Sequence, residues 1–373
     1  MLIGVPKEVK NHEYRVGLTP TSVREAVHRG HGALVESGAG LAIGLRDEDY
    51  AAAGAEVVGD AEEVFARADM IVKVKEPREA EIAMLREGQV LFTYLHLAPD
   101  PEQTKGLLAS GATAIAYETV TDRFGGLPLL APMSEVAGRM SIQAGAHCLE
   151  MEQGGRGTLL GGVAGVPAAD VLILGGGVVG SNAARIAIGC EARVTVIDLN
   201  LRRLKELDDQ FSSSLNTIYS TVDAVERHVM NSDLVIGAVL VPGAAAPRLV
   251  TEDMIKGMRR GAVVVDVAID QGGCIETARA TTHDDPTYLV HDVVHYCVAN
   301  MPGAVARTST FALNNATLPF MLALAGKGFA QAMREDPHLR AGLNIHGGAV
   351  TYEAVARDLN LAYQPSDDVL ASL

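Results

Sequence analysis

Short apolar runs alternate with amphipathic segments along the first 130 or so residues. Runs with the length and composition of strands occur at residues 2–5, 33–36, 70–75, 90–97 and 112–117. Helix-compatible segments lie at residues 61–68 and 79–85, and the sequence Thr19-Pro20 predicts the start of a further helix. Strands that alternate with helices are typical of a mostly parallel sheet covered by helices.

A stretch near the middle of the chain has the most specific local pattern. An apolar run at residues 171–174 continues into GGGVVG and then into a helix-compatible segment. In this pattern Gly175 permits the tight turn, Gly177 lets backbone approach a pyrophosphate, and Gly180 lets the helix pack close to the strand. The next strand ends in Asp198, whose carboxylate can bind both hydroxyls of an adenosine ribose and would repel a 2′-phosphate. The stretch predicts an NAD site, the alternative being an α/β turn that binds no ligand.

The remaining pattern suggests how the chain is divided. Further strands are predicted at residues 216–219, 234–241 and 263–267, whereas after about residue 307 the strand signals stop. Helices are expected there at residues 318–326, 329–333 and 352–358, and they must pack on structure already present.

A turn-rich segment at residues 121–132 marks a domain crossing, and Ser134 is the expected N-cap of the long helix that follows. We therefore expect an α/β protein of two Rossmann-like, doubly wound domains, with a mostly parallel sheet in each and a cleft between them. The expected domains are a discontinuous substrate domain, residues 1–131 and 307–373, and an NAD-binding domain, residues 132–306.

Composition narrows the classes of function. With 373 residues, 48% of them hydrophobic, the chain can form two sizeable cores. A formal net charge of −15 disfavours nucleic acid and anionic membranes as partners, so an anionic ligand must be met by local positive groups. The early charges at the N-terminus and the lack of a long uncharged apolar run predict a soluble, cytoplasmic protein.

Metal and disulfide chemistry is not indicated. The four cysteines are far apart and form no C-x-x-C pair, which favours reduced thiols. His291-Asp292-Val293-Val294-His295 superficially mimics the H-E-x-x-H zinc signature, but it has aspartate in place of the required glutamate and no obvious third ligand. We therefore expect no metal.

Several polar residues of the N-terminal domain are candidates for chemistry. Lys73 and Lys75 alternate with valines in a predicted strand and should share one face; the pattern alone favours a solvent-exposed edge strand over a ligand site. His96 follows an apolar run at a strand end, where it suits either acid/base catalysis or a structural role. Arg15, between a strand and a helix, is either a clamp for a carboxylate or simply solvated.

The later half offers two further candidates. Asp266 and Asp270 follow a strand and precede glycines, so they either lie beside a nicotinamide or substrate or cap the following turn. A loop containing Asn300, Met301 and Pro302 is a candidate for closing over the coenzyme.

Long segments of the chain resemble a known family. They are IGVPKEVKNHEYRVGLTP, IVKVKEP, LFTYLHLAPD, AIAYETV, APMSEVAGRMSIQAGA, ILGGGVVGSNAARIA, VDVAIDQGGCIET and VANMPGAVARTST. In this order they resemble the alanine dehydrogenases, in the group that includes the NAD-binding subunit of proton-translocating transhydrogenase. The resemblance implies NAD-dependent, reversible oxidative deamination of L-alanine to pyruvate and ammonium. The alternative is an NAD(H)-binding subunit that shuttles hydride within a transhydrogenase.

The resemblance also implies roles for particular residues. It implies that Arg15 and Lys75 hold the substrate, that His96 and Asp270 act as acid/base groups, and that the protein forms a homohexamer. The residues that it places at the coenzyme are Ser134, Val178, Val179, Asp198, Arg203, Ser220, Val239, Leu240, Val267, Ala268, Ile269, Asp270, Arg279, Val298, Ala299, Asn300 and Met301. One departure is QFSSSLNT, before Ile218, where the family pattern leads us to expect a glycine-containing turn.

Overall fold

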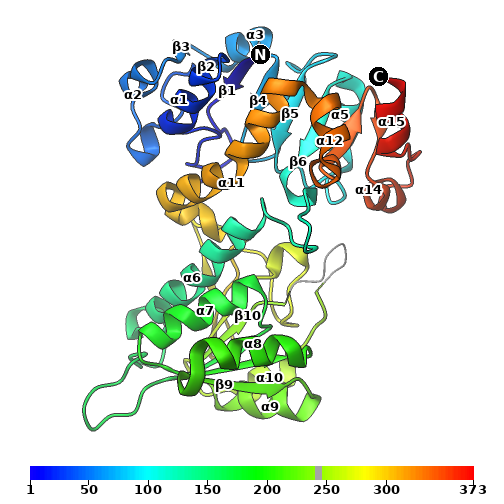
Figure 1. Cartoon of the computed structure of the whole chain (residues 1–373). Helices are drawn as coiled ribbons and strands as arrows, with labels where there is room; N and C mark the ends of the chain where they lie inside the picture. Colours follow the sequence, from blue (N-terminus) through cyan, green and yellow to red (C-terminus); the bar gives the residue numbers. More distant parts are fainter. Residues whose placement is uncertain (240–245) are drawn as a thin grey trace. The chain divides into compact units, whose positions relative to one another are not determined.

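The computed structural model describes residues 1–239 and 246–373, which divide into two compact units (Figure 1). Unit 1 consists of Met1–Met133 and Val305–Leu373, and unit 2 of Ser134–Ala304. Each unit contains a mostly parallel sheet with helices packed on it, which confirms the predicted α/β, Rossmann-like fold class.

The sheet of unit 1 has the order β15-β14-β6-β5-β4-β1-β2-β3 among the described strands. Its neighbours from β3 to β6 are parallel, whereas β14 pairs antiparallel with both β6 and β15. The strands are β1 (Leu2–Val5), β2 (Gly32–Glu36), β3 (Glu56–Val58), β4 (Met70–Val72), β5 (Val90–Thr93), β6 (Thr113–Ala116), β14 (Leu343–His346) and β15 (Ala349–Val350). The helices are α1 (Pro20–His28), α2 (Asp47–Ala52), α3 (Ala61–Arg67), α4 (Glu79–Ile82), α5 (Pro101–Ser110), α11 (Ala306–Lys327), α12 (Phe329–Glu335), α13 (Pro337–Arg340), α14 (Glu353–Asp358) and α15 (Ser366–Ser372).

The sheet of unit 2 has the order β12-β13-β11-β10-β7-β8-β9, parallel except for the β12–β13 pair. The strands are β7 (Asp170–Leu174), β8 (Arg193–Asp198), β9 (Leu215–Tyr219), β10 (Leu234–Gly237), β11 (Val263–Asp266), β12 (Thr287–Val290) and β13 (Val293–Tyr296). The helices are α6 (Ala131–Cys148), which begins in the last residues of unit 1, α7 (Val178–Gly189), α8 (Leu201–Phe211), α9 (Val222–Asn231) and α10 (Glu252–Gly257).

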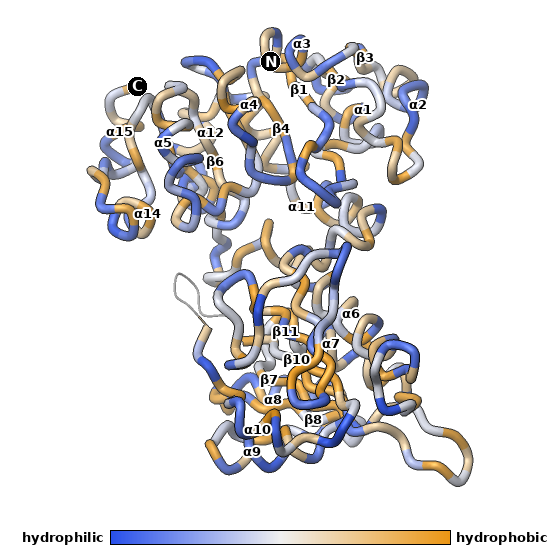
Figure 2. The backbone as a smooth tube through the Cα atoms, turned by 180° about the vertical axis from the view of Figure 1, so that it is seen from behind, coloured by the Kyte–Doolittle hydropathy of each residue, from blue (hydrophilic) through white to orange (hydrophobic). Residues whose placement is uncertain are grey.

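Both faces of the unit 2 sheet are buried. Val171 and Ile173 pack in one apolar cluster, whereas Leu172 and Leu174, on the opposite face of β7, pack in another. This is why β7 is a continuous apolar run rather than an alternating one. In Figure 2 the tube near the labels β7 and α7 is largely orange, as expected for the interior of this unit.

Three expectations about particular elements are wrong. Strand signals do not stop at residue 307, because β14 and β15 complete the sheet of unit 1, and this orange-to-red segment of Figure 1 pairs with cyan β6. Ser134 is not an N-cap, because α6 already begins at Ala131. The strand predicted at residues 70–75 ends at Val72 and, as β4, is a central strand between β1 and β5 rather than an edge strand.

Within residues 1–239 and 246–373, none of the helices combines the length and the apolar character needed to cross a membrane.

Candidate active site

The strand order marks one place in each sheet where ligands are expected. In unit 1 the connections after β1 and β4 leave toward opposite sides of the sheet, and in unit 2 the connections after β7 and β10 do the same. Open α/β sheets bind ligands beyond the carboxyl ends of the strands at this switch point. The candidate residues of each unit should therefore lie there.

Arg15 lies on the connection that follows β1, and it is only 2% exposed. Its Nε donates to Oε1 of Glu13 at 2.7 Å and its Nη2 to Oε2 of the same carboxylate at 2.5 Å. Nη1 approaches the sulfur of Met133 at 3.1 Å. Burial works against the charge, but the hydrogen bonds and charge of Glu13 prevail and raise the pKa of Arg15. Arg15 is thus a fixed, buried cation and not a solvated loop residue.

Lys73 and Lys75 do not share one environment, which corrects the expectation that both point to one face of a strand. Lys73 is fully buried and its Nζ bonds the carboxylates of Glu8, at 3.2 Å, and Glu81, at 2.6 Å. Because the strand ends before Lys73 and the chain bends there, alternation no longer determines where the two side chains go.

The side chain of Lys75 is 15% exposed, and its Nζ lies 4.0 Å from the carboxylate of Glu76. Burial lowers the pKa of the Lys75 ammonium; the charge of Glu76 opposes this shift, and the charges of Arg15 and Lys10 add to it. Lys75 and Arg15 therefore form a positive centre at the carboxyl ends of β1 and β4. Such a centre can bind a small carboxylate on an otherwise acidic protein.

His96 follows β5, the neighbour of β4, and its side chain is 40% exposed. Its backbone has a φ of +48°, a left-handed conformation, and its N–H donates to Oε1 of Glu118 at 2.6 Å. The same carboxylate accepts the N–H of Leu95 and lies 3.9 Å from Nδ1 of the imidazole. The His96 ring stacks on Tyr94 at a centroid distance of 6.0 Å. Glu118 thus fixes both the backbone and the surroundings of a partly exposed imidazole.

In unit 2 the glycine turn between β7 and α7 has the geometry of a phosphate-binding turn. Gly175 has a φ of +99°, and a Cβ on it would lie 2.7 Å from the carbonyl oxygen of Ala238. A Cβ on Gly180 would lie 1.8 Å from the carbonyl oxygen of Gly175, so only glycine fits there. A Cβ on Gly177, by contrast, would meet none of the described atoms within 4 Å. Gly177 is the N-cap of α7, so the open space lies at a helix N-terminus, where a pyrophosphate is stabilised.

Asp198 closes the same site at the end of β8. Its Oδ2 accepts the N–H of Gly176 at 2.6 Å, and its Oδ1 accepts the N–H of Asn200 at 2.7 Å. Arg203 donates from Nε to the carbonyl of Gly176 at 2.5 Å. A pocket of about 450 Å³ is lined by Gly177, Asp198, Asn200, Arg202, Arg203 and Glu206. The residues around this pocket fit the adenosine end of a dinucleotide, so the structure has room for the coenzyme beside Asp198.

The loop after β11 is organised by Asp266, which is fully buried. Its carboxylate accepts the N–H groups of Ala268 at 3.1 Å, Cys274 at 2.9 Å and Ile275 at 3.1 Å. Burial raises its pKa to about 6, although the three backbone hydrogen bonds act in the opposite direction. Asp266 therefore holds the exposed Asp270 on a fixed turn between these donors.

Other predicted coenzyme residues lie near the same edge. Ser220 donates its N–H to the carbonyl of Asp198 at 3.0 Å, and Val267 donates its N–H to the carbonyl of Gly237 at 2.9 Å. Ser134 lies one helical turn before Gly138, which packs against the backbone of Val179. Val178 and Val179 begin α7, and Val239 lies close enough to Gly175 to contact a Cβ placed there. Ala268 and Ile269 lie on the Asp266 loop. Leu240 lies outside the described residues.

The last predicted coenzyme residues lie on the loops around β12 and β13. Arg279 is exposed, and its guanidinium lies over the ring of Tyr288 at 4.1 Å. The loop with Val298, Ala299, Asn300 and Met301 is tied down at Asn300, whose carbonyl lies 2.8 Å from Nε2 of His283. Met301 and Val298 are buried in the unit 2 core.

The zinc-like motif spans the turn before β13 and the first residues of that strand, and it is not on a helix. His291 bonds Glu252 at 2.7 Å, whereas His295, in β13, bonds Thr277 at 2.7 Å. Across the part of the chain that the structure describes, no three His, Cys, Asp or Glu side chains form a group that could hold a metal ion.

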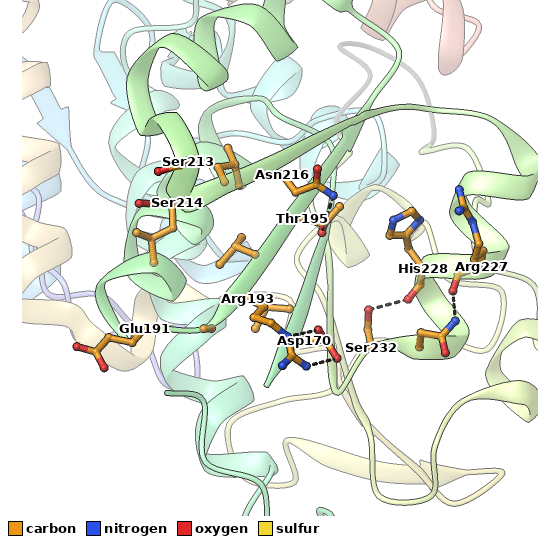
Figure 3. A pocket seen from close by; sticks show the side chains of 16 residues that line it. Asp170, Glu191, Arg193, Thr195, Ser213, Ser214, Asn216, Arg227, His228 and Ser232 are labelled. Carbon is orange, nitrogen blue, oxygen red and sulfur yellow. Dashed lines mark hydrogen bonds and ion pairs between the residues drawn. The ribbon is translucent and has the colours of Figure 1, made fainter. Parts of the chain in front are cut away.

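A larger pocket, of about 900 Å³, lies away from these residues. It is lined by the first residues of β7, β8 and β9, including Asp170, Arg193 and Asn216, and by the end of α9. Figure 3 shows Arg193 paired with Asp170, at 2.7 Å, and His228 on the far side of the pocket. This pocket therefore lies at the amino edge of the unit 2 sheet, opposite to the glycine turn between β7 and α7.

Four acidic residues that sequence reasoning missed shape the unit 1 site: Glu8, Glu13, Glu81 and Glu118. Glu13 is only two residues from Arg15, and alternating charge in NHEYR is the one signal that was available. The others reach their partners across 22 or more residues or from a separate helix, so no local pattern could reveal them.

The two switch-point sites, one lined with cations and one with glycines, are those of a two-domain nucleotide-dependent oxidoreductase. Residues 4–137 match the profile of the alanine dehydrogenase/PNT N-terminal domain, and residues 141–353 match that of the C-terminal domain. The chain therefore belongs to the alanine dehydrogenase/PNT family.

Within that family the similarity to alanine dehydrogenases is high. The alanine dehydrogenase of Halomonas elongata is 60% identical over 97% of this chain and 98% of its own length. A solved L-alanine dehydrogenase structure superposes with a TM-score of 0.94 and 51% identity, covering 96% of this chain and 99% of that one. A transhydrogenase structure from Sinorhizobium meliloti reaches a TM-score of 0.80 at 27% identity, covering 95% of this chain and 100% of that one.

Proposed function

We propose that the chain catalyses the NAD-dependent, reversible oxidative deamination of L-alanine to pyruvate and ammonium. The observation that carries the proposal is the 60% identity to an alanine dehydrogenase over nearly the full length of both chains. The buried Arg15, the partly buried Lys75 and the imidazole of His96 at one sheet edge of unit 1 support it, because a small amino acid needs a carboxylate site beside a proton-transfer group.

In this proposal unit 1 is the substrate domain and unit 2 is the coenzyme domain. Arg15, held by Glu13, binds the substrate carboxylate, and Lys75 binds the carbonyl oxygen of pyruvate. The depressed pKa of the Lys75 ammonium also lets it give up a proton more readily than an ordinary lysine. His96 moves protons to and from the carbinolamine as water adds to the iminium, and Asp270 stabilises the cationic nitrogen.

Coenzyme binding is assigned to the Gly175–Gly180 turn, to Asp198 and to the loops that follow β10, β11 and β13. A bound NAD would supply the acceptor for the hydride that leaves the substrate Cα. The open space at Gly177 and the pocket beside Asp198 support a dinucleotide, and the carboxylate of Asp198 favours a ribose with a free 2′-hydroxyl.

An amino-acid screen with either coenzyme tests the proposal. We expect NADH to form from L-alanine and NAD at alkaline pH, with much slower reaction with NADP. Turnover of a different amino acid in place of alanine would contradict the substrate assignment. Preference for NADP would contradict the role given to Asp198.

A hydride-shuttling transhydrogenase subunit is the second candidate. It is supported by the 27% identity and TM-score of 0.80 to the transhydrogenase structure, against 51% and 0.94 for L-alanine dehydrogenase. Absence of amino-acid turnover, together with hydride exchange between bound NADH and a second nicotinamide nucleotide, would favour it.

We also propose that the protein is a homohexamer in the cytoplasm, as the family resemblance implies. Light scattering coupled to size-exclusion chromatography would test the assembly: a mass near six times the 39.2 kDa chain is expected.

A further inference from the structure

Three charged side chains of unit 1 are buried together beside Lys75 but have no place in the reaction described above. Nζ of Lys73 lies 3.2 Å from Oε2 of Glu8 and 2.6 Å from Oε1 of Glu81. The three side chains are 0%, 2% and 4% exposed, respectively. Two carboxylates and one ammonium are thus held out of water at the carboxyl ends of β1 and β4.

Glu8 takes the place of a missing strand neighbour. The β1–β4 ladder pairs Ile3 with Met70 and Gly4 with Ile71. Beyond it, the N–H of Val74 donates instead to Oε1 of Glu8, at 2.6 Å. A buried N–H without an acceptor is costly, so this carboxylate oxygen stabilises the bent segment where the sheet no longer can.

Lys75 follows Val74 directly, and its backbone is also held on its other side. The hydroxyl of Thr93 donates to the carbonyl of Lys75 at 3.0 Å, and further along Glu81 accepts the N–H of Arg78 at 2.8 Å. The backbone that carries Lys75 therefore lies between fixed points, one of which is Glu8.

Stability alone does not account for the charged group. Burying a carboxylate and an ammonium removes both from water, and apolar residues of similar volume are often as stable or more stable. A role in fixing one conformation is a better explanation, because a charged acceptor holds its donors at short distance and in one direction.

We propose that Glu8 is a positioning residue for Lys75, and that Lys73 and Glu81 keep its carboxylate aimed at the Val74 N–H. This inference rests on the proposed function only for the statement that Lys75 meets a 2-oxo acid. The fixed position of the Lys75 side chain is a separate property, which can be measured without any reaction.

Two substitutions at Glu8 separate the backbone acceptor from the rest of the side chain. Glu8→Leu removes the acceptor but leaves the Lys73 ammonium paired with the Glu81 carboxylate, so that no unpaired buried charge is created. Glu8→Gln keeps a carbonyl oxygen that can accept the Val74 N–H. Asp233→Asn is the control. Asp233, like Glu8, is a buried carboxylate paired with a basic side chain, in this case Arg156, but it lies in unit 2.

The first measurement is the rate at which acetic anhydride acetylates Lys75, determined by mass spectrometry and divided by the rate at Lys105, whose side chain is 64% exposed. Glu8→Leu should raise this ratio about five-fold, because the segment that buries Lys75 is loosened, whereas Glu8→Gln and Asp233→Asn should leave it within about two-fold. Should Glu8→Leu fail to fold, Glu8→Ala, which leaves room for water, takes its place.

The second measurement is the kinetics of pyruvate reduction. Glu8→Leu should raise the KM for pyruvate about ten-fold at nearly constant NADH affinity, and Glu8→Gln should restore most of the loss. A labelling ratio within two-fold of the parent in Glu8→Leu, or equal losses in Glu8→Leu and Glu8→Gln, would overturn the proposal. If the parent protein reduces no pyruvate, the proposed function fails, and the labelling ratio alone still decides the role of Glu8.

Discussion

The two units have the same central strand order, but they place different residues at the switch point, where the strand order reverses. In each, the first five strands lie in the order third, second, first, fourth and fifth. At the reversal in unit 1 the chain places charged side chains, including the buried Arg15 and the partly buried Lys75. At the reversal in unit 2 it places glycines, two of which leave no room for a Cβ. One switch point therefore offers side chains to a ligand, and the other offers backbone.

This difference explains how one fold can serve two purposes in a single chain. In the proposed function a small carboxylate is recognised by Arg15 and Lys75, whose positions must be fixed. Glu13 holds Arg15 directly, and Glu8 holds the backbone N–H of Val74, next to Lys75. A pyrophosphate is recognised by backbone N–H groups and a helix terminus, and glycine clears the approach. The two sites should consequently respond to substitution in separable ways.

The largest effect is expected at His96. His96→Asn should lower turnover by about 10²–10⁴-fold, because asparagine cannot exchange a proton near neutral pH, while NADH affinity stays unchanged. Asparagine is chosen because it tolerates the left-handed backbone of this position better than alanine. Steady-state kinetics and NADH fluorescence titration measure the two quantities, with His228→Asn at the amino edge of unit 2 as the control. Turnover within three-fold of the parent would exclude a proton-transfer role for His96.

A substitution in the glycine turn of unit 2 should instead affect coenzyme binding. Gly177→Ala should weaken NADH binding about 30-fold, or by about 2 kcal/mol, because the added methyl group occupies the space where a pyrophosphate approaches. The melting temperature should hardly change, since no described atom lies within 4 Å of that position. Gly189→Ala, at the other end of α7 and equally uncrowded, is the matched control. Equal NADH affinity in the two variants would show that the open space is not a phosphate site.

A pH effect on stability is expected from the buried Asp266. Its pKa is about 6 in the folded protein, above the 3.8 of an unperturbed aspartate, so folding favours the protonated form. Its contribution is therefore greatest at low pH and is lost as the pH rises through 6. Between pH 4.5 and 7 the parent should lose about 2 kcal/mol of unfolding free energy relative to Asp266→Asn. Urea unfolding at the two pH values measures the difference.

Asp47 supplies the opposite trend as a control. Hydrogen bonds from Ser37 and Gly38 lower its pKa, so its contribution to stability is lost as the pH falls. Asp47→Asn and Asp266→Asn should therefore differ from the parent with opposite pH slopes. The same slope in both variants would mean that the Asp266 carboxylate stays charged throughout.

The smallest effect concerns the serine run after α8, where the resemblance leads us to expect a glycine-containing turn. Ser212 has a φ of +51°, a conformation that glycine adopts without strain. Ser212→Gly should thus stabilise the protein by about 1 kcal/mol without changing turnover or NADH affinity. Thermal unfolding detects this shift, and Ser214→Gly, two residues on, should destabilise instead. A destabilised Ser212→Gly would show that the positive φ is not strained here.

The sequence predicted most strands because their burial is local information. Val171 to Leu174, for example, is apolar on both faces because helices cover both faces of its sheet. The strand Leu343–His346 was not predicted, because a segment of only four residues after a turn shows no clear hydrophobic pattern. Its place in the sheet depends on pairing with Thr113–Ala116. Long-range pairing of this kind leaves no periodic trace.

The candidate site was predicted unevenly for the same reason. The glycine turn could be predicted because the residues that form it are close together in the sequence. Lys73 was misjudged because its partners Glu8 and Glu81 come from other elements, and a lysine in an apolar strand looks solvated until those partners are known. Residue propensities also do not predict strained backbone positions such as His96, whose left-handed conformation is held by Glu118.

The antiparallel pairing of β14 with β6 has a consequence for biosynthesis. Leu343 pairs with Ile115, so the sheet of unit 1 cannot be completed until more than 220 further residues have left the ribosome. All strand pairings of unit 2, in contrast, lie between residues 170 and 296. During translation unit 2 can therefore fold as an independent body while the first part of unit 1 waits with an open sheet edge at β6, the stage at which the nascent chain is most prone to aggregate.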